Sequence, residues 1–358
     1  MGESGTAADR TGTGAEAGEL RHPFDPEPLA RYLGATLPGF EGPLRVSQFE
    51  GGQSNPTYLL HTPSRNYVMR RKPPGALLPS AHAVDREFRV MQALHGSDVP
   101  VPRMWVCCED PQIVGTAFFV MEHLDGRLFW DPSLPGMEPA ERRAIYDEMN
   151  RVIAAVHRVD VALAGLADYG KPGNYVGRQI DRWTRQYRAS ETEPIEDMER
   201  LIQWLPAHVP PGEETSLVHG DFRIDNLVFH PAEARVLGVL DWELSTLGHP
   251  LVDFAYHAML WRVPGATFRG LAEADLAALG IPDEAAYVRR YCERTGRQRI
   301  DHWDFYLAFN LFRIAAILQG VLSRALKGNA ASAHALQEGR RVRPLARIGW
   351  AQARKVES

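Results

Sequence analysis

An aspartate and an asparagine lie five positions apart in a segment that separates two short apolar runs. The segment, 219–226, begins with His219 and contains Asp221 and Asn226. A further apolar run ends at Asp241. Two oxygen-bearing side chains suit Mg²⁺, which binds few protein ligands, and a separate carboxylate can accept a proton from an attacking hydroxyl. These residue types at this spacing indicate magnesium-assisted phosphoryl transfer.

A lone aspartate in a turn is more often a turn former or a cap. Here two motifs follow one another in a fixed order, each beside an apolar run, and this favours a catalytic role. A metal-dependent hydrolase that uses His219, Asp221 and Asp241 is an alternative. The sequence contains no second histidine at a ligand spacing such as HExxH, so the hydrolase ranks last.

With these residues the sequence resembles the aminoglycoside phosphotransferase-like family of small-molecule kinases, within the protein-kinase-like fold. His219, Asp221 and Asn226 match the family's His-x-Asp-x-x-x-x-Asn pattern, and Asp241 matches its strand-closing aspartate. The resemblance implies that Asp221 is the base that positions the acceptor hydroxyl and that His219 orders the loop. It implies that Asn226 and Asp241 bind Mg²⁺.

Segments 71–75 and 248–253 resemble a branch of this family that also occurs fused to acyl-CoA dehydrogenase domains. A protein kinase is disfavoured, because the loop reads His-Gly-Asp and Asp241 is followed by Trp-Glu. The expected partner is therefore a small-molecule hydroxyl acceptor.

A glycine-containing turn lies between the apolar runs 44–49 and 57–60, where the family has its phosphate-covering loop. Glycine lets backbone N–H groups approach phosphate oxygens, and Ser54 and Asn55 can donate hydrogen bonds. We therefore expect Gly52, Ser54 and Asn55 to contact ATP. Alone, such a turn is more often a simple hairpin.

The resemblance also implies a cation on the third strand, 67–71, that holds the α- and β-phosphates. Arg70 is the first candidate, with Glu87 of the predicted helix 82–94 as its partner. Lys72 lies on the same strand face and is the second candidate. A solvated basic run is the alternative for these residues.

The apolar run 117–121 continues into a segment that resembles the family's hinge between the lobes. The adenine edge is expected to bond the backbone carbonyl of Glu122 and the amide of Leu124. Seen alone, the run reads as a core strand.

The patterns predict an α+β, protein-kinase-like fold of two lobes. A small N-terminal antiparallel sheet plus helix precedes a larger, mainly helical C-terminal lobe. We expect a disordered tail over 1–20, a nucleotide-binding lobe over 21–124, and a catalytic and acceptor-binding lobe over 125–358. Helical patterns in the second part cover 139–159, 178–187, 195–205 and 305–322.

The composition excludes several classes of protein. A net charge of −5 and a pI near 6.2 give no support to a nucleic-acid binder. Three cysteines cannot form a disulfide framework, which fits a cytoplasmic protein. The most apolar segment, 305–322, contains Asn310 and Arg313, so a buried core helix is favoured over a membrane span.

The expected function is ATP- and Mg²⁺-dependent transfer of a γ-phosphoryl group to a small alcohol, either a hydroxyacyl-CoA or an aminoglycoside-like compound. Residues 255–358 carry 16 Arg and Lys against 9 Asp and Glu, which argues against a cationic acceptor, although solvated charge explains the same count. The alternative is a nucleotide-binding pseudokinase, kept open by Arg70 in place of lysine. Candidate acceptor contacts are Tyr169, Asn174, Tyr175, Arg178, Trp183 and Tyr187.

Overall fold

The computed structural model describes residues 17–18, 20–49, 55–74, 83–327 and 335–356. They form two compact units. Unit 1 is the chain up to Trp130 together with Ile224–Glu243, and unit 2 is the remainder. The predicted division at residue 124 kept the chain after it in one lobe, whereas contacts assign a later segment to the first unit.

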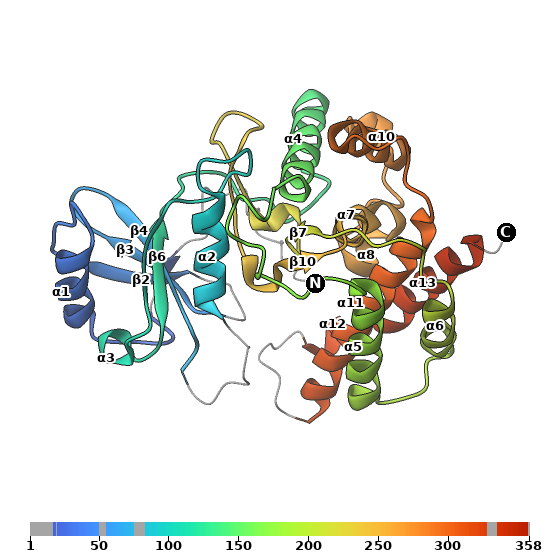
Figure 1. Ribbon diagram of the computed structural model, residues 1–358, viewed down its shortest axis with the longest axis horizontal. Coiled ribbons are helices and arrows are strands. Elements are labelled where there is room, and N and C mark those ends of the chain that lie inside the picture. Colours follow the sequence, from blue (N-terminus) through green and yellow to red (C-terminus); the bar gives the residue numbers. More distant parts are fainter. Residues whose placement is uncertain (1–16, 19, 50–54, 75–82, 328–334, 357–358) are drawn as a thin grey trace, which may run out of the picture. The chain divides into compact units, whose positions relative to one another are not determined.

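Unit 1 is built on a six-stranded antiparallel sheet of order β1-β2-β3-β4-β6-β5 (Figure 1). Its strands are β1 (Ala17–Gly18), β2 (Arg45–Phe49), β3 (Thr57–His61), β4 (Asn66–Arg71), β5 (Met104–Cys108) and β6 (Phe118–Glu122). Its α-helices are α1 (Pro26–Thr36), α2 (Val84–Leu94) and α3 (Pro111–Val114). Because β1 pairs with β2, the predicted disordered tail does not extend to Ala17–Gly18.

Strand β4 presents alternate residues to opposite faces of this sheet. Tyr67 and Met69 join an apolar cluster that includes Leu29 of α1. Arg70 lies on the other face, where its guanidinium meets α2, the helix beside β6 in Figure 1. Strand alternation therefore places Tyr67 and Met69 on the apolar face of β4 and Arg70 on the opposite face.

Arg71 is buried rather than solvated, which corrects the alternative of an exposed basic run. Its Nε donates to the Tyr58 hydroxyl at 3.0 Å, and its Nη2 donates to the His22 carbonyl at 2.9 Å. The guanidinium also lies over the Phe24 and Tyr58 rings. Arg71 thus fastens the chain that precedes α1 to the sheet.

The later segment of unit 1 contains η1 (Ile224–Asn226), β8 (Leu227–Phe229), β9 (Val236–Val239) and the start of η2 (Trp242–Leu244). β8 pairs with β9, and Phe229 also bridges to Arg127, whose N–H donates to the Phe229 carbonyl at 2.7 Å. A Cβ at Gly126 would lie 2.3 Å from that carbonyl oxygen, so this approach requires glycine. The segment is therefore tied directly to the residues after β6.

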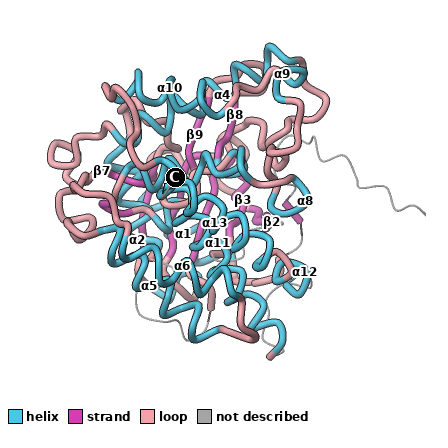
Figure 2. Tube along the Cα trace, turned by 90° about the vertical axis from the view of Figure 1, so that its right-hand side faces the viewer, coloured by secondary structure: helices cyan, strands magenta, loops and turns pink. Residues whose placement is uncertain are grey.

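Unit 2 is mainly helical. Its elements are α4 (Pro139–His157), α5 (Tyr175–Ser190), α6 (Glu196–Ala207), β7 (Ser216–Val218), β10 (Thr246–Gly248), α7 (Pro250–Ala258), η3 (Met259–Arg262), α8 (Gly265–Phe268), α9 (Leu276–Leu279), α10 (Glu284–Thr295), α11 (Trp303–Leu326), α12 (Ala335–Gly339) and α13 (Val342–Val356). Helix α11 is central, because α5, α7, α12 and α13 all pack against it. Figure 2 shows α13 beside α11. Among the described residues it is long and apolar enough to cross a membrane, but 83% of that stretch is buried in the protein, as in a core helix.

Candidate active site

A cavity of about 240 Å³ in unit 1 collects most of the residues that the sequence assigned to nucleotide and metal. Strand β4, helix α2, the segment after β6, and the ends of β8 and β9 all contribute to its lining. The predicted residues that line it are Arg70, Glu87, Glu122, Leu124, Asn226 and Asp241. Its apolar wall includes Val68, Met91, Met121, Leu128, Val228 and Leu240. A flat apolar base and a charged phosphate tail would both find matching chemistry here.

Arg70 is the electrostatic centre of this cavity. Its Nη1 lies 3.0 Å from Oε1 of Glu87, and its Nη2 lies 2.7 Å from Oδ1 of Asp241. Glu243 is a third acidic partner, 3.5 Å from Nη2. The structure therefore brings the predicted pair of Arg70 and Glu87 together and adds a predicted metal ligand to it.

Burial perturbs the protonation of Glu87, the most enclosed of these three carboxylates. The Glu87 side chain is 2% exposed, and burial raises its pKa to about 7 against the lowering effect of Arg70. Burial alone would lower the pKa of Arg70, but Glu87, Asp241 and Glu243 raise it above its ordinary value. Arg70 therefore stays charged, while Glu87 titrates near neutral pH.

Asn226 and Asp241 meet because two antiparallel strands bring them together. Asn226 immediately precedes β8, Asp241 follows β9 by two residues, and Leu227 is paired with Val239. The Leu240 amide also donates to the Asn226 carbonyl at 2.8 Å. Asp241 has a φ of +65°, a left-handed conformation that is uncommon for non-glycine residues but more accessible to aspartate than to most.

The predicted phosphate-covering turn is only partly described. Gly52 and Ser54 lie outside the described residues. Asn55 is 1% exposed and is absent from the cavity lining. Lys72, the second candidate for the phosphate-binding cation, lies 4.0 Å from Asp85 at the start of α2 and is likewise absent from the lining.

His219 and Asp221 belong to unit 2, in the loop that follows β7. The Asp221 amide donates to Nδ1 of the fully buried His219 at 3.2 Å, so the histidine folds back on its own loop. The Asp221 carboxylate receives the Tyr256 hydroxyl on Oδ1 at 2.5 Å. Nε of Arg223 lies 3.2 Å from the same oxygen.

The carboxylate of Asp253, on α7, binds backbone amides of this loop. Its two carboxylate oxygens accept the amides of His219 and Gly220, both at 2.8 Å, and Oδ2 also lies 3.1 Å from His157 Nε2. Burial would raise the pKa of Asp253, but the bond and charge of His157 and the amide of His219 hold it below its ordinary value. The carboxylate is therefore ionised and fixes the start of the loop.

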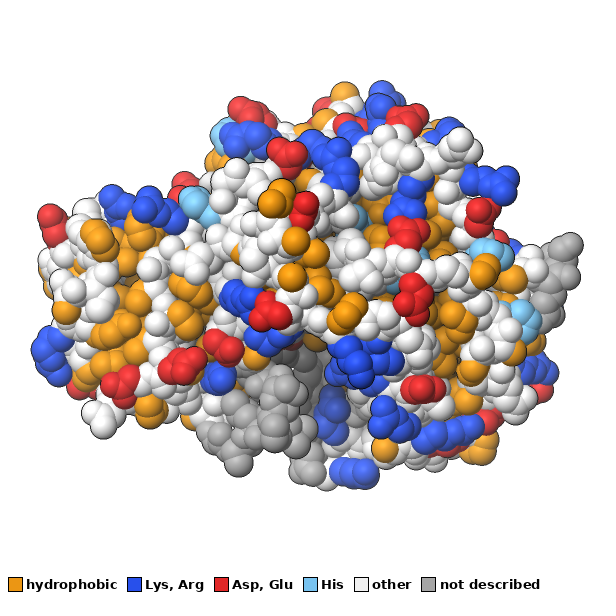
Figure 3. All heavy atoms as spheres, in the orientation of Figure 1, with side chains coloured by type: hydrophobic (Ala, Val, Ile, Leu, Met, Phe, Trp, Pro, Cys, Tyr) orange, Lys and Arg blue, Asp and Glu red, His pale blue; other side chains and the backbone are white. Residues whose placement is uncertain are grey.

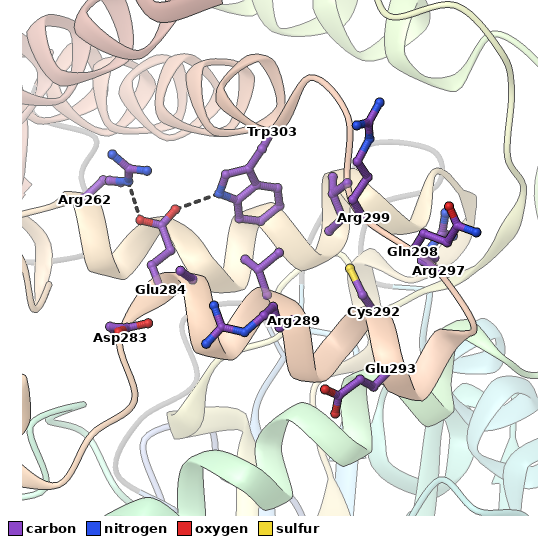
Figure 4. A pocket seen from close by; sticks show the side chains of 13 residues that line it. Arg262, Asp283, Glu284, Arg289, Cys292, Glu293, Arg297, Gln298, Arg299 and Trp303 are labelled. Carbon is purple, nitrogen blue, oxygen red and sulfur yellow. Dashed lines mark hydrogen bonds and ion pairs between the residues drawn. The ribbon is translucent and has the colours of Figure 1, made fainter.

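Two further cavities lie in unit 2, and neither contains the predicted catalytic residues. One, of about 710 Å³, runs along α10, where Glu284 accepts one hydrogen bond from Trp303 and pairs with Arg262 (Figure 4). The other, of about 220 Å³, is lined by Asn174 and Tyr175 among the predicted acceptor contacts. The remaining aromatic candidates, Tyr169, Trp183 and Tyr187, are buried.

Sequence reasoning missed three residues that touch the site. Tyr256 is 35 residues from Asp221, and no local spacing signals a contact over that distance. Arg223 lies within the segment 219–226, and Glu243 follows Asp241 by two residues, but charged residues at such loop positions are usually solvated. Only the folded arrangement identifies them.

The sequence profile of the phosphotransferase enzyme family matches residues 45–303. Over 330 residues the chain is 51% identical to mouse acyl-CoA dehydrogenase family member 10, with 91% of this chain and 31% of the relative covered. The chain thus spans about a third of that relative, and 44% of the rat acyl-CoA dehydrogenase family member 11.

Solved structures agree with this match. A Ralstonia eutropha protein assigned provisionally as an aminoglycoside phosphotransferase is 57% identical, with a TM-score of 0.86 over 93% of this chain and 99% of that chain. An aminoglycoside phosphotransferase in complex with ADP and hygromycin B shares the fold at 14% identity, with a TM-score of 0.59 over 90% of this chain and 97% of that one. The α+β, kinase-like fold predicted from the sequence is confirmed, and the chain belongs to the phosphotransferase enzyme family.

Proposed function

We propose that this protein is an ATP- and Mg²⁺-dependent kinase that transfers the γ-phosphoryl group to a hydroxyl of a small molecule. The observation that carries the proposal is the cavity of unit 1. It combines an apolar wall, a buried arginine paired with a helix carboxylate, and two oxygen-bearing side chains at neighbouring strand ends. This is the set that phosphoryl transfer requires, since catalysis there is positioning plus charge neutralisation.

The nucleotide would lie along the cavity from the hinge segment to the strand ends. The backbone carbonyl of Glu122 and the amide of Leu124 would bond the adenine edge between apolar side chains such as Val68 and Val228. Arg70 would receive the phosphates as a planar fork, held in place by Glu87. On arrival of phosphate, Arg70 exchanges part of its present bonding to Asp241 for the ligand.

The metal-binding residues would be Asn226 and Asp241. Amide and carboxylate oxygens are the donors that Mg²⁺ prefers, and both side chains line the cavity that would contain the phosphates. The described residues contain no group of three or more His, Cys, Asp and Glu that could bind a metal by themselves, which fits an ion bound mainly through substrate oxygens. Bound there, Mg²⁺ would neutralise phosphate charge.

The acceptor would be activated from the loop of unit 2. The acceptor oxygen attacks the γ-phosphorus, the bond to the β–γ bridging oxygen breaks, and ADP leaves with that electron pair. Asp221 accepts the proton that the hydroxyl loses. His219 and Asp253 hold the loop that carries it, through the bonds described above.

An anionic acceptor, such as a hydroxyacyl-CoA, is favoured over an aminoglycoside-like cation. Helix α5 carries Arg178, Arg182, Arg185 and Arg188 against one acidic residue, and basic side chains gather over it in Figure 3. Arg178 donates to backbone carbonyls only, and neither it nor Arg182 has an ion-pair partner among the described residues. An acidic groove would suit a polycation better than this basic surface.

Two measurements test the proposal. ATP with Mg²⁺ is expected to raise the unfolding temperature, because a ligand that binds only the folded state stabilises it. In a second measurement, the protein is incubated with γ-labelled ATP and hydroxylated metabolites, acyl-CoAs or antibiotics. We expect the labelled phosphoryl group to appear on compounds of one of these three classes. No thermal shift at saturating nucleotide would refute nucleotide binding, and binding without any labelled product would favour the pseudokinase.

The Asp221→Asn variant separates binding from transfer. It should keep the thermal shift with ATP and Mg²⁺ but lose phosphoryl transfer, since the amide cannot accept the proton. Asp160→Asn is the matched control, because Asp160 caps a turn by accepting the amides of Ala162 and Leu163. Full turnover in Asp221→Asn would remove Asp221 from its assigned role.

A further inference from the structure

The carboxylate of Asp221 is anchored by a phenol from outside its own loop. Tyr256 lies on α7, is 4% exposed, and its hydroxyl donates to Oδ1 of Asp221 at 2.5 Å. Burial and the nearby charge of Asp221 raise the pKa of Tyr256 far above its ordinary value. The Tyr256 hydroxyl therefore stays protonated at neutral pH and can donate this hydrogen bond.

Tyr256 is itself fixed by a second buried side chain that reaches the same loop. The guanidinium carbon of Arg313, on α11, lies 5.0 Å from the centroid of the Tyr256 ring. Nη2 of Arg313 donates to the Gly220 carbonyl at 2.7 Å. Arg313 is 7% exposed and has no ion-pair partner among the described residues. Two core helices thus hold one loop. Arg313 of α11 binds the loop's backbone, and α7 binds both the backbone, through Asp253, and the Asp221 carboxylate, through Tyr256.

A carboxylate that is free to rotate can present either oxygen to a substrate. In Asp221 the Tyr256 hydroxyl and the Arg223 guanidinium both approach Oδ1. A hydrogen bond to a charged acceptor is among the stronger ones in proteins, so it selects one orientation of the group. The bond from Tyr256 thus fixes the orientation in which the Asp221 carboxylate can meet a substrate.

We propose that Tyr256 is a positioning residue for the transfer step, because its bond to Oδ1 fixes the orientation of the Asp221 carboxylate toward the acceptor hydroxyl. This role rests on the proposed kinase function. Arg313 supports it by packing on the Tyr256 ring and bonding the residue before Asp221. Tyr256 does not touch ATP in this scheme, so its effect falls on the rate and not on nucleotide binding.

The variant Tyr256→Phe removes one hydroxyl and keeps the ring that packs on Arg313. Tyr146→Phe is the matched control, because Tyr146 is fully buried in unit 2 and its hydroxyl donates to the Pro132 carbonyl at 2.6 Å. Both variants lose one buried hydrogen bond, but only one of them touches Asp221. Comparing the two variants separates the specific effect on Asp221 from the general loss of stability that follows removal of a buried hydroxyl.

Turnover is measured as ATP consumption, first with water as acceptor and then with the first alcohol that the labelled-ATP screen identifies. Tyr256→Phe should lower kcat on the order of 10- to 100-fold, the weight of one hydrogen bond to a charged group, with KM for ATP unchanged. Tyr146→Phe should leave both constants near those of the parent. In an Asp221→Asn background, adding Tyr256→Phe should produce no further loss, since the two residues act as one unit.

An unchanged kcat in Tyr256→Phe would overturn the proposal, and so would an equal loss in the presence and absence of Asp221. A turnover-independent measurement accompanies these: urea unfolding of the two single variants and the double variant. If the effects of Tyr256→Phe and Asp221→Asn on the free energy of unfolding are simply additive, the two side chains do not interact, and the proposal fails. If the parent protein consumes no ATP with any acceptor, the proposed kinase function fails, and the positioning role fails with it. If the parent is active and Tyr256→Phe has the same kcat, only the positioning role is refuted.

Discussion

Nη2 of Arg70 lies 2.7 Å from Oδ1 of Asp241, although 171 residues separate them in the chain. The same guanidinium pairs with Glu87, so one cation joins strand β4, helix α2 and the segment after β9. This buried network is both the frame of the proposed phosphate site and a point of weakness. Removing Arg70 would take away a cation that all three carboxylates share.

Arg70→Met should destabilise the protein by about 3–5 kcal/mol, because it leaves Glu87 buried without its partner. The loss should be larger at pH 8 than at pH 5.5, since Glu87 can be neutralised by a proton at the lower pH. The double variant Arg70→Met with Glu87→Met should recover much of the stability. Urea unfolding at the two pH values measures this, and an equal loss at both would contradict a charged Glu87 as the cause.

Asp241→Ala should weaken binding of ATP in the presence of Mg²⁺ by tenfold or more and have less effect on ATP alone. The reason is that the variant removes a proposed metal ligand, whereas ATP alone depends mainly on Arg70 and the hinge. Glu243→Gln is the comparison, because Glu243 also contacts Arg70 but is not a proposed ligand. Calorimetric titration with and without Mg²⁺ measures both, and equal Mg²⁺ dependence in the two variants would argue against Asp241 as a ligand.

The stability of unit 2 should fall as the pH drops from about 6.5 toward 4, owing to His257. Burial lowers the pKa of this histidine to about 4, so the unfolded chain binds a proton that the folded chain does not. The stabilisation is complete above pH 6.5 and is lost through that window, at up to about 1.4 kcal/mol per pH unit.

His257→Asn should flatten this pH dependence relative to the parent. His302→Asn is the control, because His302 is exposed. Unfolding midpoints at half-unit intervals between pH 4 and 7 provide the comparison. Parallel curves for the parent and His257→Asn would mean that another group is responsible.

Gly220→Ala should disturb the loop that carries Asp221. Gly220 has a φ of +84°, and an added Cβ would lie 2.7 Å from the Leu244 carbonyl oxygen. Strain of this kind costs about 1–3 kcal/mol. It falls on a residue whose amide donates to Asp253 and whose carbonyl accepts from Arg313. Turnover should fall more than global stability does, which activity and unfolding measured on one preparation would reveal.

Much of unit 1 was predictable because its signals are local. The family resemblance implied a strand cation paired with a helix carboxylate, and the local patterns placed Arg70 on that strand and Glu87 on the following helix, where the structure pairs them. Helix α1 was missed, although Asp25 caps it and Pro26 opens it, because its apolar stripe is short. Strand β5 was missed as well, since two adjacent cysteines do not form a recognisable alternation.

The remaining features of the fold and the site could not be predicted from local sequence patterns. No pattern within the segment 224–243 shows that it packs against Gly126 and Arg127, so a boundary at residue 124 was the natural prediction. Tyr256 and Arg313 become site residues only because their helices cross the same loop. The roles assigned to the site residues stay predictions, but most of those that the structure describes gather in the cavity of unit 1 or in the loop after β7.

The excursion of residues 224–243 into unit 1 means that the backbone passes between the units three times. Neither unit is therefore encoded by one uninterrupted stretch of gene. A fragment that stops at Trp130 would lack β8 and β9, along with Asn226 and Asp241, and would expose the apolar wall they complete. Rearrangements during evolution can append whole domains outside this two-unit block, but they cannot exchange one half of it by a single crossover.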